Sequence, residues 1–406
     1  MDIKESNNYL DYVMQRFYTI GSDDSGGVTR LSYTKEEDQM HEEFRKMGEE
    51  EGFIVETDDV GNTFLSLKKY SEYYLIGSHL DSVINGGRFD GVLGVASGLL
   101  LLKIIKENNL NIPVKVAAFR CEESSNFMKS TLGSGLITGE YLFENFHMLK
   151  SIDGKTIEKI FDERGYNKKP NVIQGIKEYL EIHIEQGRVL ESKGLRIGIV
   201  SAIAGNMRLK ISVIGLAEHS GATPMNLRRD ALCAASEIIL GVEKVGQGDF
   251  TNNAVATIGA IENHPNSVNV IPGKVVLNVD IRDVSINTME EMKLSIEKLV
   301  KNICYNRKVE YEMELISSSK GVQMNDDIKN KLCRICDNMN LKYIIMQSGA
   351  GHDAMKFANI TKCGMIFIPC KDGISHNPKE DANINDAVDA CMIILEYLKS
   401  EILNKE

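Results

Sequence analysis

The order of strand-like and helix-like segments changes twice along this 406-residue chain, and this feature constrains its fold most strongly. Apolar runs at 73–79 (YYLIGSH) and 114–120 (VKVAAFR) are typical of buried strands, and a Gly-containing helical stretch lies between them. Strands that alternate with helices predict an α/β architecture with a mainly parallel sheet. Because the chain is too long for one ordinary core, we expect two domains.

A different pattern begins near Met207. Strands are expected over 207–218, 254–263, 274–283 and 309–318, and helices over 228–245 and 287–302. The order βαββαβ is that of a ferredoxin-like unit, which is a compact domain in its own right. After about Gly321 the first pattern resumes. We therefore predict a discontinuous first domain, residues 1–206 and 321–406, with a second domain of residues 207–320 inserted into it.

Charge and apolar runs exclude several classes of protein. The net charge of −11 disfavours nucleic acid or an anionic membrane as a partner, because both require a basic face. The longest apolar run, 92–105, contains Lys103 and is too short to cross a bilayer. Most of the eight cysteines lie in apolar patterns, and the lone CxxC of Cys333 and Cys336 lacks a second pair, so we interpret it as core packing. We expect a cytoplasmic protein.

Residues able to bind metal occur in short, mostly Gly-rich segments. They are His79 (GSHLDS), Asp90 (GGRFDGVLGV), the adjacent Glu122 and Glu123 (FRCEES), His183 (EIHIEQG) and His376 (GISHNP). Imidazole and carboxylate without cysteine suit Zn, Mn, Co or Ni. A bridging carboxylate with further carboxylates and imidazoles is what a two-metal hydrolytic centre requires. We therefore predict a dinuclear metallohydrolase.

Local spacing indicates a separate role for several of these residues and their neighbours. Asp81 follows His79 by two positions and is placed to accept the second ring N–H of a metal-bound imidazole. Glu122 and Glu123 point in different directions after a strand, so one can bind metal while the other accepts a proton. The alternatives are a surface turn at 79–81, an exposed acidic loop at 122–123, and a packing role for His183. His352 follows a Gly-rich turn and suits an anion-binding or oxyanion role.

These motifs, in this order over nearly the whole chain, resemble the hydantoinase/carbamoylase family of amidohydrolases. That family includes N-carbamoyl-L-amino acid hydrolases and allantoate amidohydrolases, within the larger aminoacylase/carboxypeptidase group of dinuclear metallohydrolases. HIEQG is the most discriminating motif, because the wider group generally has a carboxylate at the position of His183. Two segments depart from the usual family pattern, namely EESSNF, with Asn126 in place of arginine, and HSGATPM.

The resemblance implies a role for each matching position. One metal would bind His79, Asp90 and His183, the other would bind Asp90, Glu123 and His376, and Glu122 would be the general base. The substrate would be held by Gln186, His219, Asn269, Arg282 and His352. Arg282 suits a substrate carboxylate because guanidinium offers paired donors, and its alternative is an ion pair with Asp280 or Asp283. The inserted domain would act as a lid and dimerisation domain of a homodimer.

The activity implied is that of an amidohydrolase with two divalent ions per subunit. It would hydrolyse a linear C–N amide (ureido) bond in a small carboxylate substrate, converting an N-carbamoyl-L-amino acid to the L-amino acid, CO₂ and ammonia. The alternatives are an allantoate amidohydrolase, an aminoacylase or dipeptidase, and a non-catalytic metal-binding relative. The last is disfavoured because all five ligands and the base are present.

Overall fold

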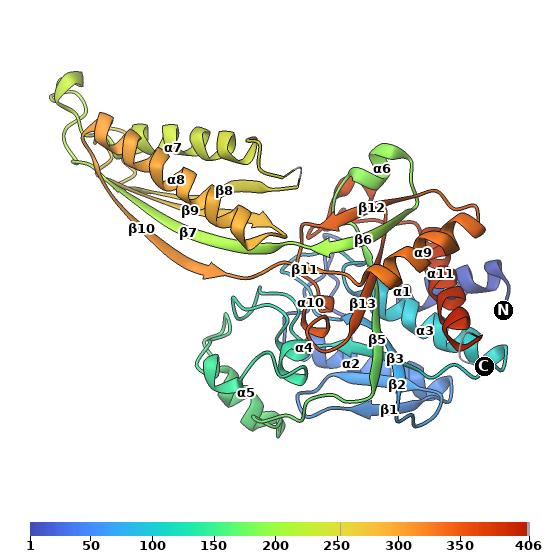
Figure 1. The fold of residues 1–406 in the computed structure, drawn as a ribbon. Coiled ribbons are helices and arrows are strands. Elements are labelled where there is room, and N and C mark those ends of the chain that lie inside the picture. The colour runs from blue at the N-terminus through green and yellow to red at the C-terminus, as the bar shows by residue number, and fades with distance from the viewer. Residues whose placement is uncertain (252, 404–406) are drawn as a thin grey trace. The chain divides into compact units, whose positions relative to one another are not determined.

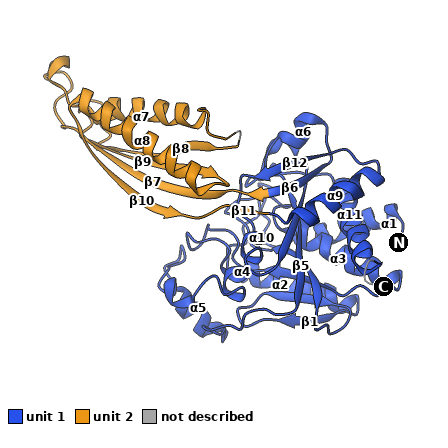
Figure 2. Ribbon diagram, viewed as in Figure 1, with its two compact units in different colours: residues 1–201, 324–406 blue, residues 202–323 orange. Residues whose placement is uncertain are grey.

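The computed structural model describes residues 1–251 and 253–403. Within these residues the strands form a nine-stranded sheet and a four-stranded sheet. The chain divides into two compact units, unit 1 with residues 1–201 and 324–406 and unit 2 with residues 202–323 (Figure 2). Unit 1 is thus built from two stretches of chain that unit 2 separates in sequence.

The larger sheet belongs mainly to unit 1 and has a parallel centre. Its order is β1-β2-β4-β3-β5-β13-β6-β11, with β12 pairing β6. The strands are β1 (Ile54–Thr57), β2 (Thr63–Ser66), β3 (Tyr73–His79), β4 (Val114–Phe119), β5 (Ile176–Ile184), β6 (Ile197–Ile203), β11 (Val322–Gln323), β12 (Tyr343–Ser348) and β13 (Lys362–Ile368). β4, β3, β5 and β13 pair in parallel, whereas β1, β2, β6 and β11 pair antiparallel toward the edges. The structure is therefore mixed α/β, with its parallel strands in the middle.

Long helices pack with one face of this sheet into a single hydrophobic core (Figure 1). They are α1 (Ile3–Tyr18), α2 (Lys35–Glu50), α3 (Val92–Glu107), α9 (Asp326–Asn338) and α11 (Ile384–Leu403). In α1, buried Leu10, Val13 and Phe17 recur at helical spacing, and Asp2 and Glu5 form a capping box at its start. α3 is apolar on nearly every side because it lies between the sheet and the outer helices.

Shorter elements lie on the opposite face of the sheet or connect its strands. They are α4 (Leu132–Ile137), η1 (Phe143–Asn145), α5 (Ile157–Arg164), α6 (Val189–Lys193), α10 (Ala354–Phe357) and η3 (Lys371–Gly373). Alternate residues of a strand point to opposite faces, so Leu180 and Ile182 join the main core while Tyr179 and His183 face the other side. There the ring of Tyr179 stacks on Phe357 of α10, with centroids 4.4 Å apart.

Unit 2 follows the order β7 (Gly205–Ile214), η2 (Met225–Leu227), α7 (Ala231–Gly246), β8 (Val255–His264), β9 (Lys274–Asp283), α8 (Ile286–Arg307) and β10 (Glu310–Ser318). Its strands are antiparallel in the order β10-β7-β9-β8 and share a core with both long helices. α7 begins after the expected position because Asp230 caps it by accepting the N–H groups of Leu232 and Cys233.

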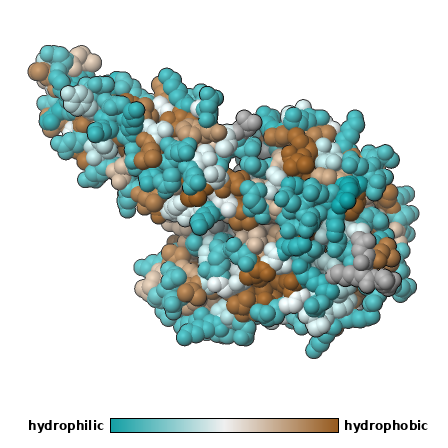
Figure 3. Space-filling view, in the orientation of Figure 1, coloured by the Kyte–Doolittle hydropathy of each residue, from teal (hydrophilic) through white to brown (hydrophobic). Residues whose placement is uncertain are grey.

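The surface drawn in Figure 3 is largely hydrophilic, with smaller hydrophobic patches on each unit. Isolated apolar side chains on a surface are usual in folded proteins. Among the described residues, every helix is too short or too polar to span a membrane.

Candidate metal centre

The parallel centre of the larger sheet brings the predicted ligands to one edge. His79 is the last residue of β3, Glu122 and Glu123 follow β4, and His183 lies at the end of β5. His376 comes shortly after β13, which pairs with β5 and places Phe367 opposite His183. The carboxyl ends of parallel strands meet at the same edge of a sheet, which is where ligands bind in α/β folds.

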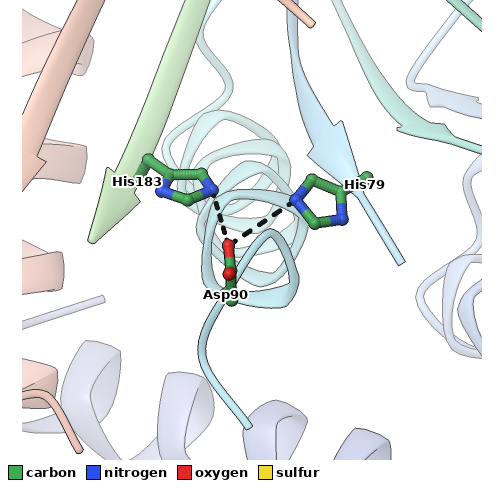
Figure 4. Close-up of side chains that lie close together, drawn as sticks. All are labelled: His79, Asp90 and His183. Atoms are coloured by element: carbon green, nitrogen blue, oxygen red, sulfur yellow. Dashed lines mark ion pairs between the residues drawn. The ribbon is translucent and has the colours of Figure 1, made fainter. Parts of the chain in front are cut away.

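Asp90 is the centre of the cluster, and one of its oxygens faces a first group of imidazoles. Its Oδ1 lies 3.1 Å from His183 Nε2 and 3.7 Å from His79 Nε2. Figure 4 shows both rings directed at this carboxylate from the ends of their strands. The backbone turns at Gly91, which has φ of 67° and leads into α3. A Cβ on Gly91 would lie 2.4 Å from the His79 ring, so only glycine allows this approach.

The other oxygen of Asp90 faces a second group. Its Oδ2 lies 2.9 Å from His376 Nε2, and that nitrogen is 3.1 Å from Glu123 Oε1. In each of the two groups the potential ligand atoms lie within 4.8 Å of one another. The first group is buried, whereas the His376 side chain is 46% exposed. One carboxylate therefore joins a buried group to a group open to solvent.

Backbone carbonyls orient the first two imidazoles. His183 Nδ1 is 2.9 Å from the carbonyl of Ile184, and His79 Nδ1 is 3.1 Å from the carbonyl of Asp81. A carbonyl can only accept, so each Nδ1 donates to its carbonyl and each Nε2 is the nitrogen that faces Asp90. The Gly91 N–H lies 3.3 Å from His183 Nε2. Both rings are therefore held with Nε2 directed toward the place that a shared metal would take.

Asp81 is wholly buried and fixes the segment that carries the two glutamates. Its Oδ1 accepts the N–H of Glu122 and its Oδ2 accepts the N–H of Glu123, both at 3.0 Å. Oδ2 also accepts the hydroxyl of Ser32 at 2.7 Å, and Oδ1 is 3.4 Å from His79 Nδ1. One carboxylate thus links three of the predicted site residues.

Glu122 lies beside the first group without belonging to it. Its Oε2 is 3.9 Å from His79 Nε2, and the residue is 7% exposed. Burial, together with the neighbouring acids Glu123, Asp353 and Asp81, raises the pKa of Glu122 well above its usual value, although His79 opposes the shift. These surroundings favour the protonated form of the carboxyl more than water does.

The site attracts positive charge. Hydrogen bonds with Asp90 and Glu123 raise the pKa of His376 to about 11, because the two carboxylates stabilise a cation at its ring. A divalent ion satisfies the same preference, and the donor set of imidazole nitrogens and carboxylate oxygens suits a transition metal. The residues present therefore fit a metal at each group.

The other predicted site residues divide between the units. In unit 1, Gln186 Nε2 donates to Asp90 Oδ2 at 2.9 Å, and His352 packs edge-on against the His183 ring with centroids 4.5 Å apart. In unit 2, the N–H of Ser220, which follows His219, donates to the carbonyl of Asn269. Arg282 Nε donates to Asp280 at 2.8 Å, so the ion pair that the sequence also allowed is present.

Sequence reasoning missed a set of residues that brace Asp81. The hydroxyl of Ser32 bonds Asp81, and the carbonyl of Ser32 accepts the side-chain amide of Asn126 at 2.7 Å. The sequence drew attention to Asn126 only as a departure from the family pattern. Contacts between residues so far apart in the chain leave no pattern in the local sequence. Of this set, only Asp81, two positions after His79, was identifiable from the sequence.

Comparison with known proteins gives consistent matches over the length of the chain. The family described as Peptidase family M20/M25/M40 matches residues 75–400. The chain belongs to this family. Among the relatives of this M20/M25/M40 member is an N-carbamoyl-L-amino-acid amidohydrolase of Pseudomonas sp. (strain NS671), 35% identical over 98% of this chain and 99% of its own. An allantoate amidohydrolase of Escherichia coli (strain K12) is 36% identical over 91% of each chain.

Solved structures support the same assignment for this M20/M25/M40 protein. An amidase of the hydantoinase/carbamoylase family from Burkholderia multivorans superposes with a TM-score of 0.89, at 32% identity over 97% of both chains. The resemblance expected from the motifs is therefore confirmed, and the protein is an amidohydrolase of a metal-dependent family.

Proposed function

We propose that this chain is a two-metal amidohydrolase that cleaves the carbamoyl C–N bond of N-carbamoyl-L-amino acids. The observation that carries the proposal is the geometry of Asp90, whose Oδ1 faces His183 and His79 while its Oδ2 faces His376. A carboxylate that presents one oxygen to each of two ligand groups is the bridge that a dinuclear site requires.

His79, Asp90 and His183 would hold one ion, and Asp90, Glu123 and His376 the other. Zn, Mn, Co and Ni all suit these ligands. The bound ions would polarise the scissile carbonyl and lower the pKa of water in the site. The Nδ1 bonds of His79 and His183 keep both rings oriented for that role.

Glu122 is proposed as the general base and acid. It is almost buried beside the first group, and its raised pKa suits a group that accepts a proton from the attacking water and returns it to the leaving nitrogen. Asp81 acts through its neighbours, because it holds the backbone N–H groups of Glu122 and Glu123 without facing substrate.

The substrate proposal rests on relatives and on the polar residues that the resemblance assigns. Gln186 and His352 lie at the cluster in unit 1, and His219, Asn269 and Arg282 are the proposed contributors from unit 2. Arg282 would bind the substrate carboxylate in exchange for Asp280. Allantoate is the second candidate substrate, because the Escherichia coli relative of that name is as similar as the carbamoyl-acting ones.

We further propose that unit 1 is the catalytic domain and that unit 2 is an inserted ferredoxin-like lid and dimerisation domain of a homodimer. The βαββαβ order of unit 2 and its separate hydrophobic core support this division. All eight cysteines, each within the described residues, are free thiols, and this supports a reducing compartment such as the cytoplasm.

The test is ammonia release from metal-free protein reconstituted with Mn, Co, Ni or Zn in turn. N-carbamoyl-L-amino acids, their D-forms and allantoate are the substrates, and protein left without metal is the control. Turnover of the L-carbamoyl substrates supports the proposal and identifies the metal. Turnover of allantoate alone moves the assignment to the second candidate, and no turnover of any ureide refutes both.

A further inference from the structure

Glu380 is a nearly buried acid that the proposed mechanism does not use. It follows His376 by four residues, in the loop between η3 and α11, and is 3% exposed. Its Oε1 accepts the backbone N–H of Phe89 at 2.8 Å and that of Asp90 at 3.0 Å. Its other oxygen, Oε2, accepts the hydroxyl of Ser375 at 2.8 Å. These three hydrogen bonds of the carboxylate all go to segments that carry a proposed ligand.

Ser375 extends the connection to the bridging carboxylate itself. Its Oγ lies 3.3 Å from Asp90 Oδ2, the oxygen that faces His376. Ser375 directly precedes His376, which has φ of 55° and so leaves the serine in a sharply turned loop. Glu380 thus fixes the backbone of Asp90 with one oxygen and the loop of His376 with the other.

The segment before Asp90 has room for the Glu380 side chain because residue 87 is a glycine. A Cβ on Gly87 would lie 2.0 Å from the carboxyl carbon of Glu380, a separation that no side chain could occupy. Next to the buried contact, Arg88 pairs with Asp381 at 3.1 Å, so the same two loops are also joined at the surface. A buried carboxylate is tolerated when its oxygens are hydrogen-bonded, and here both are.

We propose that Glu380 is a positioning residue for metal binding. It fixes the loop of Asp90 relative to the loop of His376, so that the Asp90 carboxylate can contribute one oxygen to each ligand group. The inference rests on the proposed two-metal function. Glu380 contacts no potential ligand atom of either group directly and acts through backbone N–H groups and Ser375. Residues that orient ligands in this way change metal affinity by about 10–100-fold when removed.

The experiment measures Zn and Mn binding to metal-free protein by calorimetry for the wild type, E380A, E380Q, S375A and a control, D230A. Asp230 matches Glu380 because its Oδ1 also accepts two backbone N–H groups, but it caps α7 in unit 2 and touches no proposed ligand. E380A is expected to weaken binding by about 10–100-fold, whereas D230A leaves it within about twofold.

E380Q and S375A separate positioning from a general loss of structure. Glutamine keeps an oxygen for both backbone N–H groups and can donate to Ser375, so E380Q is expected to restore affinity to within about fivefold of the wild type. S375A should weaken only one of two binding events, since the bonds to Phe89 and Asp90 remain. At saturating metal, KM for substrate should be unchanged in all variants, because Glu380 does not face substrate.

The outcomes distinguish this inference from the function on which it rests. A wild-type protein that binds no divalent ion refutes the two-metal function itself. If the wild type binds two ions and E380A binds them equally well, only the role of Glu380 is refuted. An equal loss of affinity in E380A and D230A, or no recovery in E380Q, would also overturn it. If E380A does not fold, S375A decides, and unchanged affinity in that variant counts against the proposal.

Discussion

Replacing Asp81 by asparagine tests whether this buried carboxylate holds Glu122, Glu123 and His79 in position. The variant keeps the shape of the side chain but turns one of two acceptor oxygens into an amide donor. Whichever way the amide faces, one backbone N–H, of Glu122 or of Glu123, meets a donor instead of an acceptor. Asp81 is wholly buried, so water cannot compensate.

The magnitude follows from the lost bonds. One buried N–H without an acceptor costs about 1–3 kcal/mol, and each of the two remaining bonds loses about 1 kcal/mol when its acceptor is no longer charged. We therefore expect D81N to lower the free energy of unfolding of the metal-free protein by about 3–5 kcal/mol. Metal affinity should fall by about 10–100-fold, because the ring of His79 and the backbone of Glu123 are less constrained.

Urea unfolding of the metal-free protein and metal competition against a chelator measure the two effects. D230N is the matched control, because Asp230 also accepts two backbone N–H groups and asparagine caps a helix as well as aspartate does. The control should change stability by less than about 0.5 kcal/mol. A D81N variant as stable as D230N, with wild-type metal affinity, would refute the reasoning.

Four further predictions concern activity, binding and pH. E122Q should retain metal while losing about 10²–10⁴-fold in kcat, measured by ammonia release, and near-normal kcat would remove Glu122 as the base. R282A should raise KM with little change in kcat, and an unchanged KM would contradict a role in carboxylate binding. G91A should weaken metal binding in calorimetry, because its Cβ displaces the His79 ring, and wild-type affinity would contradict that clash. Burial lowers the pKa of His41 well below its usual value. As the pH decreases below about 6.5, the unfolded chain binds a proton at His41 that the folded protein does not, so the free energy of unfolding decreases. H41Q should therefore lose about 2 kcal/mol less than the wild type between pH 7 and 5 in urea unfolding of the metal-free protein, and equal losses would refute this.

The sequence predicted those parts of the fold and site that local patterns encode. β3 and β4 were recognisable as apolar runs, and the polar residues at their ends indicated where a site would form. In unit 2 the strands alternate apolar and polar residues, and the observed helices lie within a few residues of those expected. α8 continues one turn beyond the expected end, to Arg307, and in that turn Cys304 is buried in the core of unit 2.

What could not be predicted depends on contacts between distant residues. Nothing local in the sequence indicates that Glu380 accepts the N–H of Asp90, because the two are 290 residues apart. Cys121 adopts a positive φ of 56°, which turns the chain toward Glu122, and cysteine carries no preference for that conformation. The antiparallel edges of the larger sheet were also not expected, since β1 and β2 are only four residues each.

The position of β13 has a consequence for how the protein is made. This strand lies between β5 and β6, yet the ribosome adds it only after the whole of unit 2. A nascent chain that ends in unit 2 already contains His79, Asp90 and His183, but β5 and β6 still lack the strand that separates them. The first metal group can therefore assemble during synthesis, whereas the second waits for His376. In the proposed two-metal enzyme, the second ion would therefore bind late, after the last strand has been added to the sheet.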